Sequence, residues 1–174
     1  MTQEKIDHLY KIRHTASHAL ASAVKKLYPD VKLGFGPVID TGFYYDFSFP
    51  KEISDKDLPK IEKEMKKVLR RNLQMTGKEV TAEEAKAEQA NQPFKHELID
   101  EYAGEGKKLT LYALGDFVDL CKGGHVDNTQ EMNPEAIHLT GLAGAYWRGD
   151  EKNPMLTRIY AAAFETPEEL EKYL

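Results

Sequence analysis

The sequence has little cysteine and no long apolar run. Cys121 is the single cysteine among 174 residues, which excludes an intrachain disulfide and favours a reducing compartment. No window approaches the roughly 18 consecutive apolar residues of a membrane span, and the first residues lead into no apolar signal segment. We therefore expect a cytoplasmic protein with no membrane partner, whose single thiol is free, metal-bound or catalytic.

The sequence also lacks an excess of positive charge. Its 24 Lys and Arg residues face 29 Asp and Glu residues, so the formal net charge is -5 and no bulk cationic field attracts nucleic acid. Any contact with RNA must use a local patch. The best candidate is the stretch 54–72, where basic side chains outnumber acidic ones: Lys56, Lys60, Lys63, Lys66, Lys67, Arg70 and Arg71 against Asp55, Asp57, Glu62 and Glu64.

Length and composition fit one globular domain that contains both helices and strands. Apolar spacing predicts helices over 6–27 and 54–72, two short helices after Thr81 and Pro93, and a last helix from 166. Short strands are predicted within 31–49 and over 73–80, 109–114, 117–121, 137–147 and 155–164. We predict an α+β fold with a mostly antiparallel sheet and helices packed on one face of it.

Two histidines stand four residues apart within the first predicted helix. His14 and His18 therefore share one helix face. At roughly 100° per residue this face lies about 150° from the apolar stripe centred on Leu20, so the imidazoles do not point into the core that Leu20 enters. Alone, the pair is compatible with a solvated polar face, a metal site or a catalytic site.

A second group of chemically active residues lies at the end of a predicted strand. Asp119 and Cys121 face the same side of strand 117–121, and the pair Gly123-Gly124 allows a sharp turn that returns His125 to Cys121. The alternative is a plain hairpin turn with a small buried thiol. Combined with His14 and His18, the group offers three imidazoles and one thiolate, a possible tetrahedral zinc set, so we expect one shared site.

Longer motifs surround these residues. They read GPVIDxGFYYD at 36–46, GAYWRGD at 144–150 and MLxRIY at 155–160. Together with the pairs His14/His18 and Cys121/His125, they resemble the editing domain of bacterial threonyl-tRNA synthetase over almost the entire chain. The four-residue spacing of the possible ligands is shared with alanyl-tRNA editing proteins, whereas the longer motifs are similar to the threonyl family in particular.

The resemblance implies hydrolysis of the ester in seryl-tRNA(Thr), with the serine-carrying acceptor end of tRNA(Thr) as partner. Serine and threonine differ by one methyl group. The site that attaches the amino acid to tRNA discriminates against a substrate without this methyl group by only ~1–3 kcal/mol of binding energy. A second pocket that admits serine, excludes threonine and hydrolyses the ester restores fidelity.

The resemblance also suggests roles for individual residues. His14 and His18 would orient and deprotonate water, with Cys121 and His125 beside them. Lys95 would stabilise charge or activate water, although a surface lysine is the alternative. The expected substrate-binding residues are Asp119, which would hold the substrate ammonium or orient an imidazole, Tyr45, which would contact the adenosine or seryl group, and Gly36. The alternative for Asp119 is a charged residue at a strand edge, and the alternative for Tyr45 is an aromatic side chain of the core.

The cofactor requirement is harder to predict. Ligation by His14, His18, Cys121 and His125 together would saturate zinc, whereas catalytic zinc usually keeps three protein ligands and one open position. We expect no required cofactor, with zinc possible on these four residues. A further option makes Cys121 a nucleophile with His125 as its base.

The resemblance finally suggests how the chain is organised. We expect an editing domain over residues 1–165, and over 166–174 the start of a linker helix toward a catalytic domain that this chain lacks. The catalytic domain of the parent synthetase is then a partner, and this chain alone neither binds ATP nor aminoacylates. The alternatives are a free-standing, zinc-dependent deacylase of the alanyl type and a tRNA-binding module without catalysis.

Overall fold

The computed structural model describes residues 1–174, and it confirms the α+β class. All strand pairs are antiparallel. The helices are α1 (Gln3–Leu27), α2 (Leu58–Leu69), α3 (Ala82–Glu88), α4 (Pro93–Gly104) and α5 (Pro167–Tyr173). The strands are β1 (Lys32–Leu33), β2 (Val38–Ile39), β3 (Gly42–Ser48), β4 (Met75–Val80), β5 (Leu109–Leu114), β6 (Phe117–Leu120), β7 (Ile137–Tyr146) and β8 (Met155–Ala163).

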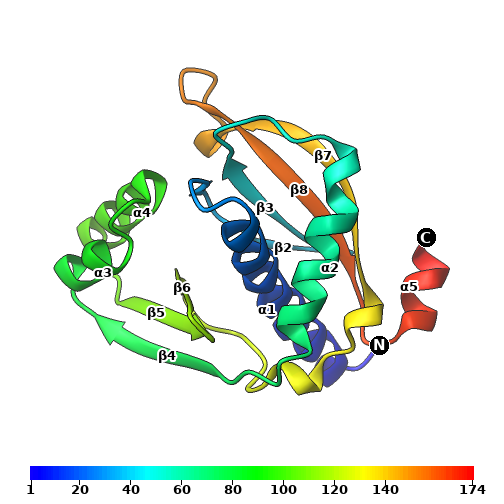
Figure 1. The fold of residues 1–174 in the computed structure, drawn as a ribbon. Helices are drawn as coiled ribbons and strands as arrows, with labels where there is room; N and C mark the ends of the chain where they lie inside the picture. The colour runs from blue at the N-terminus through cyan, green and yellow to red at the C-terminus, as the bar shows by residue number, and fades with distance from the viewer.

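The strands form two sheets where the sequence suggested one. The larger sheet has the order β1-β3-β8-β7, with β2 also paired to β3, and the smaller has the order β4-β5-β6. Figure 1 shows α1 between the two sheets, with α2 beside it and with α3 and α4 near the smaller sheet. The smaller sheet pairs consecutive strands, whereas β3 pairs with the distant β8, and strand periodicity does not encode such pairing.

Two clusters of buried apolar side chains form the core of the molecule. The larger lies between the helices α1 and α2 and the larger sheet, and it includes Leu20, as the helical stripe predicted. The smaller cluster packs α3 and α4 against the smaller sheet. It also includes Trp147, which follows β7, and Leu156 of β8. Fully burying such side chains stabilises a fold by roughly 1.5–3 kcal/mol each. The helix α1 is therefore fixed in place between the two sheets.

Local capping signals in the sequence are confirmed. Ser54 and Thr81 each form a reciprocal capping box, Pro93 opens α4, and Thr166 caps α5. The helix predicted over 54–72 is shorter, because it begins with a 3-10 turn and its α-helical part ends at Leu69. None of the helices combines the length and apolar composition that crossing a membrane requires.

Candidate functional site

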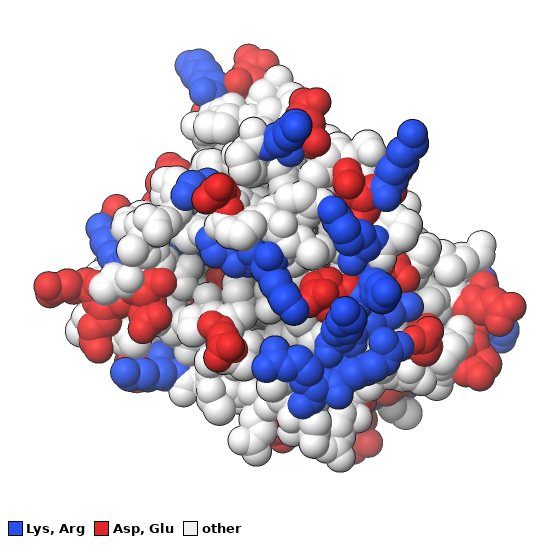
Figure 2. Space-filling model, in the orientation of Figure 1, with Lys and Arg blue, Asp and Glu red and all other residues white.

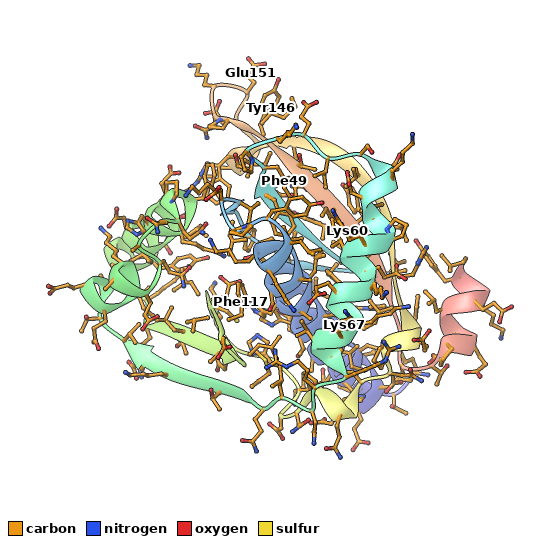
Figure 3. All side chains as sticks on the ribbon, viewed as in Figure 1. Phe49, Lys60, Lys67, Phe117, Tyr146 and Glu151 are labelled. Atoms are coloured by element: carbon orange, nitrogen blue, oxygen red, sulfur yellow. The ribbon has the colours of Figure 1, made fainter.

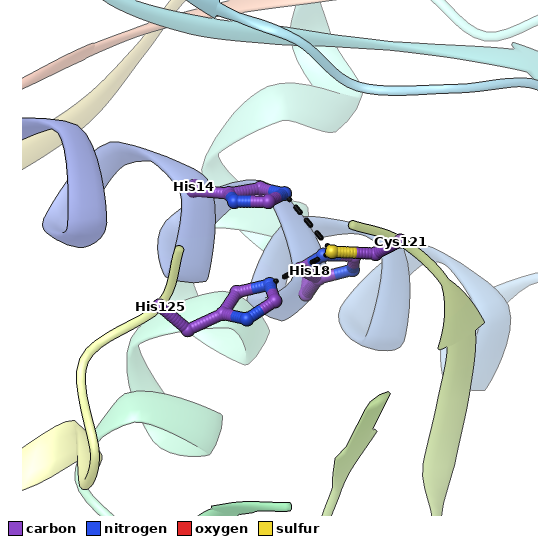
Figure 4. A group of neighbouring side chains, drawn as sticks. All are labelled: His14, His18, Cys121 and His125. Carbon is purple, nitrogen blue, oxygen red and sulfur yellow. Dashed lines mark hydrogen bonds between the residues drawn. The ribbon is translucent and has the colours of Figure 1, made fainter. Parts of the chain in front are cut away.

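The four possible metal ligands predicted from the sequence lie together between α1 and the end of β6. One ligand atom from each of His14, His18, Cys121 and His125 lies within 4.8 Å of the others. Figure 4 shows the thiol between two imidazoles, with Sγ 3.3 Å from Nε2 of His14 and 3.2 Å from Nε2 of His125. The rings of His14 and His125 stack at 4.1 Å between centroids.

The glycine pair that follows Cys121 forms the turn that the sequence predicted. Gly123 and Gly124 have φ values of 98° and 89°, a region that favours glycine over other residues. The amide of Gly123 donates to Sγ of Cys121 at 3.2 Å, and the carbonyl of Gly124 accepts from Nδ1 of His14 at 3.3 Å. The turn thus returns His125 to the thiol and joins the loop to α1.

Asp119 is the centre of a buried polar network. One of its oxygens accepts hydrogen bonds from Nδ1 of His18 at 3.0 Å and from the Tyr45 hydroxyl at 2.7 Å. The other accepts from Nζ of Lys95 at 2.7 Å and from the amide of Leu120 at 2.9 Å. Burial alone would raise the pKa of Asp119, but the Lys95 ammonium and His18 lower it well below its ordinary value. The carboxylate is therefore ionised and saturated with donors.

Burial keeps His14, His125 and the Cys121 thiol uncharged near neutral pH. It lowers the pKa of His14 to about 4 and that of His125 to about 2, with the neighbouring His18 adding to both shifts. Burial also raises the pKa of the Cys121 thiol to about 12, against a smaller opposing effect of the Gly123 amide. His14 and His125 are therefore neutral, each with a lone pair on one ring nitrogen, while the thiol remains protonated.

The hydrogen bonds define which imidazole nitrogens carry lone pairs. An ionised carboxylate and a carbonyl only accept, so His18 and His14 each donate from Nδ1, and each keeps a lone pair on Nε2. Nε2 of His18 is buried and has no hydrogen-bond partner, and neither has Nδ1 of His125. An unpartnered buried lone pair indicates a ligand, a water or a substrate atom at this position.

The donor set fits a zinc ion. Tetrahedral zinc places sulfur and nitrogen ligands ~3.6 Å apart, and the two sulfur–nitrogen distances here are 3.3 and 3.2 Å. The carboxylate of Asp119 orients His18 through its other nitrogen, as partners of zinc-binding histidines commonly do. The site can therefore bind zinc through His14, His18, Cys121 and His125, although four protein ligands would leave no position for water.

A cavity of about 300 Å³, here called the site cavity, opens onto these groups. It is lined by all the candidate site residues named from the sequence except His125: His14, His18, Gly36, Tyr45, Lys95, Asp119 and Cys121. Gly36 lies so close to the Tyr45 ring that a β-carbon would be 2.2 Å from its Cδ2. A larger cavity, of about 760 Å³, contains no residue of the cluster, so chemistry identifies the site better than size does.

The structure decides between several alternatives left by the sequence. His18 is 4% exposed and Lys95 is 2% exposed, so neither a solvated helix face nor a surface lysine describes them. Tyr45 is buried and yet lines the cavity, so it is both a core residue and a site residue. The site also contains Tyr10, which we missed, although its position one helical turn before His14 was a usable signal.

The basic stretch predicted over 54–72 forms a visible patch. Figure 2 shows Lys and Arg gathered over α2, and Figure 3 shows Lys60 and Lys67 on this helix. Part of the charge is neutralised, because Lys66 pairs with Glu62 at 3.2 Å and Arg70 pairs with Glu135. Any attraction for phosphate groups therefore comes from the remaining unpaired charges.

Comparisons with known proteins agree with these features. Residues 109–160 match the family described as threonyl and alanyl tRNA synthetase second additional domain. The whole chain is 47% identical over 174 residues to a threonine–tRNA ligase of Rubrobacter xylanophilus. Over 99% of the chain, it is 48% identical to the chloroplastic/mitochondrial threonine–tRNA ligase 2 of Arabidopsis thaliana, and over 93% it is 50% identical to the enzyme of Thermotoga petrophila.

The matched region is only part of these relatives. The chain spans 27%, 27% and 25% of their respective lengths, about a quarter in each case. The family match includes Asp119, Cys121 and His125, and the helix that carries His14 and His18 lies within the full-length matches. The chain is thus similar over its whole length to one part of threonine–tRNA ligases, and its residues 109–160 match the second additional domain of threonyl and alanyl tRNA synthetases.

Proposed function

We propose that this chain hydrolyses the ester of seryl-tRNA(Thr), as the editing part of a threonyl-tRNA synthetase. The observation that carries the proposal is the buried lone pair on Nε2 of His18, which is oriented by Asp119 beside a buried lysine. An ester hydrolase needs a base for water and a group that stabilises the tetrahedral oxyanion, and these residues supply both.

His18 is the proposed general base. Its Nδ1 donates to Asp119, so Nε2 is available to accept a proton from a water molecule, as in triads that combine an imidazole and a carboxylate. Asp119 has four donors around its two oxygens, which supports a role in orienting His18 over binding of the substrate ammonium. The water oxygen attacks the ester carbon while its proton moves to His18.

Lys95 is the proposed partner of the oxyanion. A lysine ammonium has three donors, and two of them bond to Asp119 and to the Tyr45 hydroxyl at 2.9 Å. The third is free to stabilise the carbonyl oxygen when it receives the electron pair. Collapse of this intermediate breaks the bond to the ribose oxygen, which takes a proton from His18, and serine is released.

Cys121 is proposed to position water and substrate, together with His14 and His125. Its raised pKa, about 12 because of burial, disfavours the thiolate that nucleophilic attack needs. The neutral imidazoles of His14 and His125 offer acceptors on either side of the thiol. This arrangement supports direct attack by water over a covalent intermediate on Cys121.

A zinc-dependent deacylase of the alanyl type is the second candidate, because the donor set fits the ion. His14, His18, Cys121 and His125 would hold the metal, which would supply Lewis-acid stabilisation of negative charge. The metal content of the purified chain distinguishes the candidates. Zinc at one equivalent after exhaustive dialysis favours the second candidate, whereas hydrolysis by chain that contains no zinc favours the first.

The decisive experiment follows ester loss from seryl-tRNA(Thr) and threonyl-tRNA(Thr) with the purified chain. We expect selective loss of the seryl ester and a decrease of ~10²–10⁴-fold in rate for His18→Ala. His8→Ala is the matched control, because His8 lies on the same helix and bonds to Glu165 outside the site cavity. Binding of tRNA without turnover would instead indicate a binding module.

Cys121→Ser tests the direct attack of water. We expect it to retain hydrolysis within about tenfold of the wild type, because water and His18 remain in place. A complete loss of turnover with intact folding and tRNA binding would contradict this mechanism and favour a covalent one.

The partners and domain limits follow from the same proposal. Residues 1–165 form the editing domain, 166–174 begin a linker toward the catalytic domain of the parent synthetase, and the protein acts in the cytoplasm. The basic patch on α2 contacts phosphates of the acceptor stem. Lys63→Glu, at an exposed position of this patch, should weaken tRNA binding and reduce its salt dependence.

A further inference from the structure

A second cavity borders the proposed hydrolytic site. It has a volume of about 390 Å³ and lies between α4, the end of β7 and the turn that follows β7. We propose that this cavity, here called the side cavity, binds the base of the nucleotide that precedes the aminoacylated adenosine. The inference rests on the proposed function, because it assumes that the adenosine ester occupies the site cavity.

The two cavities share a wall. Phe35, Leu98 and Tyr102 line both the site cavity and the side cavity. Consecutive nucleotides are joined by one phosphodiester, so the next base must enter a space that borders the first. The larger cavity of about 760 Å³ also borders the site cavity, through Tyr10 and Val38, but its lining includes only two aromatic side chains, Tyr10 and Phe164.

The side cavity presents aromatic rings to solvent. Phe35 is 44% exposed and Tyr146 is 40% exposed, so a ligand can reach both rings. Figure 3 labels Tyr146 near the tip of the β7–β8 hairpin. Proteins recognise single-stranded RNA mainly by stacking its unpaired bases on such rings.

The polar groups of the side cavity suit a base better than a phosphate. Arg148 bonds to Glu101 at 2.6 Å, and Arg158 bonds to Asp46 at 2.8 and 3.0 Å. Each guanidinium is thus paired with a carboxylate, which lowers the attraction for a phosphate dianion or monoanion. The pairs instead offer both donors and acceptors, and the edge of a nucleobase carries both.

The backbone holds Arg148 in an unfavourable conformation. Its φ of 58° and ψ of 22° lie in the left-handed region, which non-glycine residues seldom adopt, and Gly149 follows with a φ of 70°. Two hydrogen bonds hold the turn: Nε1 of Trp147 donates to Glu97 at 2.8 Å, and Nδ2 of Asn153 donates to the Trp147 carbonyl at 2.9 Å. Such strain persists where surrounding contacts enforce it, and it often accompanies binding sites.

The test compares two small substrates with the purified chain: the seryl ester of adenosine and the seryl ester of cytidylyl-adenosine, which adds one nucleotide. We expect a KM about tenfold lower for the dinucleotide ester in the wild type, because one base stacks in the side cavity. Tyr146→Ala should abolish this advantage without changing the KM of the adenosine ester. Arg148→Gly, which suits the observed φ, should reduce the advantage.

A control variant and a binding measurement separate this inference from the proposed function. Tyr173→Ala removes another exposed tyrosine, on α5, and should change neither KM. Trp147, the single tryptophan, lines the side cavity, so quenching of its emission by unesterified cytidylyl-adenosine reports binding without turnover. Quenching that Tyr146→Ala weakens supports the inference even if neither ester is hydrolysed.

The results that would contradict the inference alone differ from those that would also contradict the proposed function. Equal KM values for the two esters in the wild type, with no effect of Tyr146→Ala, would overturn the inference and leave the proposed function standing. If neither ester is hydrolysed and the dinucleotide causes no quenching at millimolar concentration, both the proposed function and this inference fail.

Discussion

Asparagine in place of Asp119 would leave the ammonium of Lys95 buried without its counter-charge. The side chains of Asp119 and Lys95 are 1% and 3% exposed, and their charged atoms are 2.7 Å apart. Removing one partner of a buried ion pair typically costs about 3–5 kcal/mol, because the remaining charge keeps its desolvation penalty. We expect Asp119→Asn to lower the free energy of unfolding by this amount, out of a total of roughly 5–15 kcal/mol.

Urea denaturation followed by Trp147 fluorescence measures this loss. Trp147 packs against Phe94 of α4, with ring centroids 4.9 Å apart, so its emission reports whether the helix that carries Lys95 stays docked. With a slope of about 1–3 kcal/mol per molar urea, the midpoint should fall by about 2 M. The double variant Asp119→Asn/Lys95→Met should recover at least half of the loss, because it also removes the uncompensated charge.

An exposed ion pair provides the matched control. Asp100 lies 2.6 Å from Lys86, but its side chain is 65% exposed. Asp100→Asn should therefore change the free energy of unfolding by less than about 0.5 kcal/mol. A loss below about 1 kcal/mol for Asp119→Asn, or a double variant no more stable than the single one, would refute the assignment of a buried charge pair.

Three further predictions concern the walls of the site. Gly36→Ala should destabilise the fold by about 1–3 kcal/mol and impair hydrolysis, because its β-carbon would overlap the Tyr45 ring; urea denaturation and ester loss measure the two effects. Gly123→Ala should displace His125 and destabilise the fold by a similar amount, because alanine is strained at a φ of 98° and its β-carbon would lie 2.7 Å from the Tyr112 hydroxyl. A hydrolysis rate and a urea midpoint equal to those of the wild type would contradict this. Burial and Asp119 raise the pKa of Tyr45, so Tyr45 should remain protonated in the native protein up to about pH 10.5. In a spectroscopic titration to this pH, the wild type and Tyr45→Phe should therefore show the same increase in phenolate absorbance. The contribution of Tyr45 to the free energy of unfolding should be lost only as pH rises above about 10.

The sequence by itself determined the elements and much of the site chemistry. The helical period predicted α1 and the common face of His14 and His18, and capping residues such as Thr81 predicted where helices begin. The glycine pair after Cys121 predicted a turn that brings His125 back to the thiol. These features follow from interactions between residues a few positions apart, which local patterns record directly.

Only the tertiary structure decided what surrounds those residues. The polar face of α1 is buried because a second sheet covers it, and the sequence pattern could not distinguish that cover from solvent. Lys95, Asp119 and Tyr45 come from α4, β6 and β3, and their network depends on how two apolar clusters pack these elements together. Protonation and hydrogen bonding in the site therefore depend on burial by distant segments, which no local pattern of residues specifies.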